Sequence, residues 1–176
     1  ISAQIDKIII APILGFELLG NYALALQFFV VLMMLANIVF KYLLTQESSG
    51  KNTQRLKNYT ILLSVAIAVF GIIVIPKIIP ILFPKFISSI DAIQIISLSV
   101  IPSTIALIYE SKFLALEKSK FLVISKSIAT IIIVFGFLTL GLTYQMIGLV
   151  TTVLLAASFQ AIFLFICNKI LEHNQD

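Results

Sequence analysis

The chain has 176 residues, of which 60% are hydrophobic and 11% are charged, and its formal net charge is +4. This apolar share exceeds that of soluble domains, so the composition excludes a soluble globular protein and indicates an integral membrane protein. Seven of the 12 basic residues lie in short breaks between apolar runs or after the last run, so the positive charge gives no reason to expect a nucleic-acid partner.

The apolar runs predict six membrane-spanning helices, because one crossing takes about 20 residues at a rise of ~1.5 Å each. The predicted helices are a truncated first helix ending near Leu14, then helices near 21–45, 58–84, 89–115, 120–141 and 145–168. The breaks between them read GFELLGN, QESSGKNTQR, PKFISS, LEKSK and LTYQM. Breaks this short make adjacent helices antiparallel. We therefore expect an all-α integral membrane fold in which residues 1–176 form one six-helix bundle.

The two ends of the sequence show no sign of a signal peptide, an internal disulfide or a metal site. The chain begins at Ile1 inside an apolar run without a basic region or a cleavage site, which is unlike a signal peptide, and we expect a further N-terminal part. Cys167 and His173 have no companions at metal-ligand spacing, and a single cysteine cannot form an internal disulfide. We expect neither a metal nor another cofactor.

Polar and charged residues inside the first predicted helix call for an explanation, since a charge at a helix centre costs about 2.5 to 3.5 kcal/mol on insertion scales. Asp6 and Lys7 lie on the side opposite the isoleucines, below Pro12, which is expected to kink the helix. They are sequence neighbours, so they cannot neutralise each other as an i,i+4 pair would. Each is expected to have a partner elsewhere or to face a cavity.

Two further helices carry polar stripes at helical spacing. The second helix has Ala23, Gln27, Val30, Met34, Asn37, Lys41 and Thr45, and the fourth has Ala92, Ser99, Ser103, Ala106 and Glu110. Such stripes indicate either a hydrated surface or tight seams between helices. Lys41, Lys112 and Lys126 could instead extend to the headgroups at a helix end.

The positions of the basic residues predict which loops are cytoplasmic, and the positions of the prolines predict where a helix is distorted. Basic residues concentrate in the second and fourth breaks and after the last helix, which predicts that these loops and the C-terminus are cytoplasmic. Pro76, Pro80 and Pro84 each remove a backbone hydrogen bond, so the end of the third helix should be bent or partly unwound.

The order of several motifs resembles the polysaccharide flippases of the multidrug/oligosaccharidyl-lipid/polysaccharide exporter superfamily. The residues that carry the resemblance are DKIIIAPILGFELLGNYALA, IIPILFPKFISSIDAIQIISLSVIP and GLTYQMIGLVTTVLL, with Pro84 where that family usually has glycine. The resemblance implies the C-terminal lobe of a two-lobe, MATE-like transporter whose N-terminal lobe is its partner. It also implies that the first two helices of the lobe help to line a central cavity.

On this reading the chain is not an enzyme but a multi-pass protein of the inner (plasma) membrane. It would flip a polyprenyl-diphosphate-linked oligosaccharide from the cytoplasmic to the outer leaflet by alternating access. Lys7, Lys41, Asn37 and Gln27 are the substrate-path candidates, and Asp6 and Glu110 are candidates for charge pairing or cation coupling. The alternatives are a cation-coupled multidrug antiporter of the same fold and a membrane polysaccharide polymerase or acyltransferase. The latter would need a long outer loop or clustered catalytic residues, which this sequence lacks.

Overall fold

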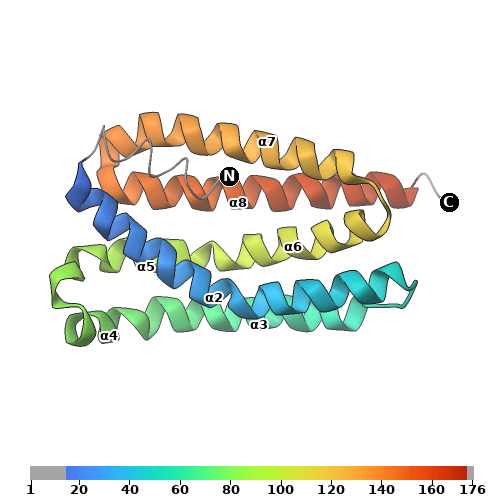
Figure 1. Ribbon diagram of the computed structural model, residues 1–176, viewed down its shortest axis with the longest axis horizontal. Coiled ribbons are helices and arrows are strands. Elements are labelled where there is room, and N and C mark those ends of the chain that lie inside the picture. The colour runs from blue at the N-terminus through green and yellow to red at the C-terminus, as the bar shows by residue number, and fades with distance from the viewer. Residues whose placement is uncertain (1–14, 174–176) are drawn as a thin grey trace.

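The computed structural model describes residues 15–173, and within them the chain is helical almost throughout and forms no strand (Figure 1). The elements are α2 (Phe16–Ser48), α3 (Gln54–Ile73), α4 (Ile75–Leu82), η1 (Pro84–Ser89), α5 (Ile90–Leu98), α6 (Val100–Ala115), α7 (Ser119–Gly136), η2 (Phe137–Gly141) and α8 (Leu142–His173). The long helices lie side by side and run alternately in opposite directions along the long axis of the bundle (Figure 1). The predicted all-helical class is therefore confirmed.

Four helical stretches between residues 15 and 173 are long and apolar enough to cross a membrane. They are Phe16–Ser48, Gln54–Ile73, Pro84–Ala115 and Ser119–Glu172. The last stretch folds back on itself, because α7 and α8 pack antiparallel (Figure 1) and Gln145 interrupts the helix at φ 49° and ψ −125°. The predicted LTYQM break lies at this reversal. The predicted first helix, with Asp6 and Lys7, lies outside the described residues.

The first predicted break is wrong. The GFELLGN segment was expected to be a turn, but α2 begins at Phe16, directly after Gly15 with its φ of 87°. Its polar residue Asn21 accepts a hydrogen bond from the hydroxyl of Ser89 at 2.9 Å, and Tyr22 and Ala25 are buried. Tertiary packing thus outweighs the cost of about 1 kcal/mol that glycine carries inside a helix.

The proline segment is bent as predicted. The helix that was expected to run to residue 84 ends at Ile73, and a short α4 and the 3-10 helix η1 follow. Pro80 lies inside α4, and Pro84 begins η1. The missing amide donors explain why this end of the bundle turns in short steps.

The small and hydroxyl stripe predicted for the fourth helix forms a seam at the centre of the bundle. It spans α5 and α6, where Ala92, Ser99, Ala106 and Glu110 are buried and Ser103 is half-buried. The two helices contact α2, α3 and α8 around them. Small residues allow this close approach between helices, which matters in lipid because burial from water contributes little there.

The hairpin between α7 and α8 depends on two glycines at its closest contacts. A Cβ at Gly148 would lie against the backbone carbonyl of Leu140, and one at Gly136 would lie against the side chain of Thr152. The carbonyl belongs to the backbone and cannot swing aside as a flexible side chain could. The reversal of the chain near Gln145 therefore requires the absence of a side chain at position 148.

We predict that Gly148→Ala lowers the free energy of unfolding by about 1 to 3 kcal/mol, because the added methyl group would collide with the backbone carbonyl of Leu140. Gly20→Ala is the matched control, since nothing lies within 4 Å of a Cβ at Gly20. The control should leave stability unchanged or raise it. Thermal unfolding of both variants in detergent measures the difference, and equal midpoints for the two would show that the contact is not tight.

Candidate functional site

A groove of about 260 Å³ lies between α2, α6 and α8. Its lining consists of Phe29, Val30, Met33 and Asn37 from α2, Ser103, Ala106, Leu107 and Glu110 from α6, and Gln160 from α8. The walls are mainly apolar and four side chains supply polar groups. Such a mixture is typical of sites that bind small molecules or parts of larger ligands.

One face of α2 borders this groove and is not covered by the rest of the described bundle. Gln27, Asn37 and Lys41 on this face are all exposed. The helix buries a different face, which includes Tyr22 and Ala25. The side-chain amide of Asn37 donates a hydrogen bond of 3.0 Å to the carbonyl of Met33 within the same helix. The polar stripe predicted for this helix is thus a surface and not a seam among residues 15–173.

Glu110 is the charged residue of the groove, and its carboxylate is fixed by two other helices. The residue is only 6% exposed. One carboxylate oxygen accepts a hydrogen bond of 2.8 Å from Nε2 of Gln160 in α8, and the other lies 3.1 Å from Nζ of Lys126 in α7. The groove therefore contains a positioned anion with partners on one side and open space on the other.

The structure brings some predicted site residues together and separates others. Asn37 and Glu110 line the same groove, while Gln27 and Lys41 share the exposed face of α2 outside the lining. Lys7 and Asp6 lie outside the described residues. Gln160 was not predicted, although a lone glutamine in the apolar run AASFQAIFLF is a signal of its own. Because Gln160 lines the groove, α8 forms its third side, next to α2 and α6.

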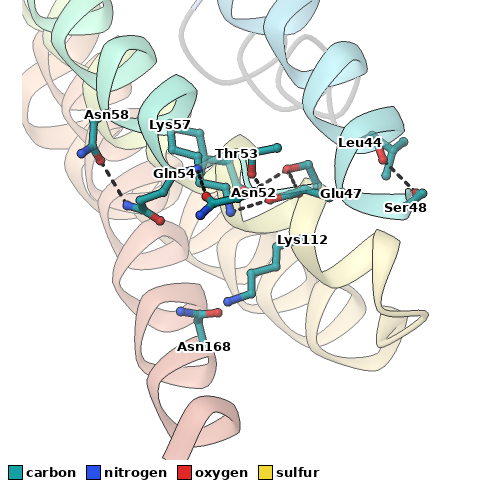
Figure 2. Close-up of polar contacts among 12 residues, drawn as sticks. Leu44, Glu47, Ser48, Asn52, Thr53, Gln54, Lys57, Asn58, Lys112 and Asn168 are labelled. Carbon is teal, nitrogen blue, oxygen red and sulfur yellow. Dashed lines mark hydrogen bonds and ion pairs between the residues drawn. The ribbon is translucent and has the colours of Figure 1, made fainter. Parts of the chain in front are cut away.

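A second polar centre lies at the end of the bundle that carries the α2–α3 hairpin (Figure 2). The Glu47 carboxylate forms an ion pair with Lys57 and accepts hydrogen bonds from Thr53 at 3.1 Å and from Ser111 at 2.7 Å. Since this carboxylate already has three partners, the cluster fastens the hairpin to α6 and is a weaker candidate for ligand binding.

Beside this cluster, a separate contact joins α6 to α8. Lys112 pairs with Glu172 at 2.7 Å, and Asn168 donates a hydrogen bond of 3.2 Å to the same carboxylate. Lys112 and Asn168 lie close to the Glu47 cluster in Figure 2. The contact holds the last turns of α8 against α6.

A larger hollow, of about 470 Å³, lies near the opposite end of the bundle. Its lining includes Glu17, Asn21, Asp91, Tyr144 and Gln145. Both carboxylates are exposed, so water can solvate them without a ligand. The groove beside Glu110 holds a buried carboxylate, which makes it the stronger candidate site.

No group of three or more His, Cys, Asp or Glu residues in the described part of the chain could hold a metal ion. Comparisons with protein families, with curated proteins and with solved structures find no match to this chain. The candidate site therefore rests on its own geometry.

We predict that Gln160→Leu lowers stability by about 1 to 2 kcal/mol, because the buried Glu110 carboxylate loses a donor. The matched control is Gln27→Leu, which changes an exposed glutamine for which the described residues provide no hydrogen bond. The control should stay within about 0.5 kcal/mol of the wild type. Denaturant titration in micelles compares the two, and a larger loss for the control would contradict the importance of the Glu110 contact.

Proposed function

We propose that this chain is one lobe of a membrane transporter that moves a polyprenyl-diphosphate-linked oligosaccharide from the cytoplasmic to the outer leaflet by alternating access. The observation that carries the proposal is the exposed polar face of α2 beside the Glu110 groove. Polar groups on a membrane-length helix are costly against lipid. A facing second lobe, with a hydrated cavity between the lobes, would remove that cost.

The residues of this face suit a glycan attached to a diphosphate. Gln27 and Asn37 present amides, which can hydrogen-bond to sugar hydroxyls. Lys41 lies one turn beyond Asn37 and has no ion-pair partner among residues 15–173, so its charge is available to the diphosphate. The lipid tail would stay in the bilayer beside the exposed apolar residues of α2, which include Val31, Leu35 and Ile38.

The proposal extends to the remaining sequence candidates and to the cellular setting. Lys7 and Asp6 would lie on the preceding helix of the same cavity wall. The α2–α3 and α6–α7 hairpins lie at the same end of the bundle as the end of α8 (Figure 1), and in our proposal this end is cytoplasmic. The protein would then be a multi-pass protein of the plasma membrane, with the lipid-linked glycan and an N-terminal lobe as its partners.

We predict that Lys41→Ala reduces translocation of a lipid-linked glycan by at least about tenfold, because a charge-assisted contact to the diphosphate is lost. Lys77→Ala is the matched control, since Lys77 is an exposed lysine in α4 at the other end of the bundle. The assay follows glycan delivery to the outer leaflet in proteoliposomes of the full protein. Unchanged transport by the Lys41 variant would remove this residue from the path.

One observation favours a cation-coupled antiporter as the second candidate. Glu110 is the only charged residue lining the groove in the described part of the chain. A buried carboxylate suits a cationic drug, Na⁺ or H⁺ better than it suits a diphosphate.

Glu110→Gln separates the two candidates, because the amide keeps the size of the side chain and removes its charge. If the protein is a flippase, this variant should translocate lipid-linked glycan close to the wild-type rate. If it is an antiporter, cation-driven drug efflux should be lost in the same variant. Drug efflux by the wild type, without any effect on glycan translocation, would overturn the first proposal.

A further inference from the structure

The cations of the described chain concentrate at one end of the bundle. This end carries the α2–α3 hairpin, the α6–α7 hairpin and the end of α8 (Figure 1). Its basic residues in or beside the two hairpins are Lys51, Arg55, Lys57, Lys112, Lys118 and Lys120. At the opposite end, the basic Lys77 and Lys85 are balanced in number by the acidic Glu17 and Asp91.

Three of the four acidic residues described near the basic end form ion pairs, and the side chains of two of these three are buried. The side chains of Glu47 and Glu110 are each 8% exposed, and they pair with Lys57 and Lys126. Glu172 pairs with Lys112. These three pairs neutralise three lysines. Glu117, at the tip of the α6–α7 hairpin, is exposed and has no ion pair in the described part of the chain.

Four cations in or beside the two hairpins remain free. Lys51, Arg55 and Lys120 are exposed and Lys118 is half-buried, and none of them forms an ion pair with another residue between 15 and 173. Even with Glu117 counted, this surface has an excess of positive charge. These ion pairs therefore leave a polybasic surface at this end of the bundle.

Two tyrosines indicate where this surface lies relative to a bilayer. Tyr42 in α2 is 56% exposed and Tyr59 in α3 is 70% exposed, and both lie within about two turns of the loop that joins α2 to α3. Exposed tyrosines concentrate at the boundary between hydrocarbon and headgroups. Lys51 and Arg55 then lie at or just beyond headgroup depth, within reach of lipid phosphates.

We propose that Lys51, Arg55, Lys118 and Lys120 bind the phosphates of anionic lipids in the leaflet at this end of the bundle. The recognition is electrostatic: headgroups with net negative charge are bound, and zwitterionic headgroups of similar size are not. This interaction is independent of the transported substrate. It anchors both hairpins to the membrane surface from which the helices emerge.

The test compares two double variants with the same number and kind of charge removed. Lys118→Gln with Lys120→Gln alters the proposed surface, and Lys77→Gln with Lys85→Gln is the matched control at the other end. The full protein in neutral detergent is titrated with phosphatidylglycerol, and thermal stabilisation gives the apparent affinity. A cation near an anionic surface contributes about fivefold, so the first double variant should bind roughly 25-fold more weakly. The control should bind as the wild type does.

Three further arms make the outcome decisive. Phosphatidylcholine should give no comparable stabilisation, and higher salt should weaken the phosphatidylglycerol effect. Lys118→Arg with Lys120→Arg keeps the charge and should retain binding, which separates loss of charge from a defect in folding. Equal weakening in both glutamine double variants, no weakening in either, or equal stabilisation by inorganic phosphate without lipid would each overturn the proposal.

Discussion

Three consecutive polar residues near the end of α6 hold the bundle together. Glu110 contacts Gln160 in α8 and Lys126 in α7, Ser111 donates to Glu47 in α2, and Lys112 pairs with Glu172 in α8. Successive residues on a helix point in different directions, so one short segment can reach several neighbours. Helices in lipid gain little from hydrophobic burial against each other. Directional contacts of this kind therefore link α6 to α2, α7 and α8, while α3 packs against α6 without one among the described residues.

The same sequence pattern has two different outcomes in this protein. Polar stripes on α2 and on α5–α6 have similar spacing, yet the first is exposed and the second is mostly buried. The difference comes from position in the bundle, since α5 and α6 lie among α2, α3 and α8 while one face of α2 lies at the edge. A stripe alone does not reveal how many neighbours its helix has. That is why the sequence left both a hydrated surface and a seam open as alternatives.

The helices themselves were largely predictable from apolar runs and breaks, because both the length of a crossing and the cost of charges in lipid are strong constraints. The first break was wrong because Gly20 and Asn21 look like a turn, while their structural role depends on Ser89, which lies far away in sequence. Gln160 was missed for a related reason. A lone glutamine forms no stripe, and its importance appears only when α8 places it beside Glu110.

Pairing inside the bundle also decides which cations remain free for other roles. Glu110 engages Lys126, and Glu47 engages Lys57. Lys41 has no such acid within reach in the described residues, although it lies only one turn, or ~6 Å along the axis, beyond the groove residue Asn37. An unpaired lysine about two turns inside the end of a membrane-length helix is costly unless it meets an anion or water. In the proposed transporter, this cost, more than the presence of a lysine, is the reason to assign a negatively charged ligand to the exposed face of α2.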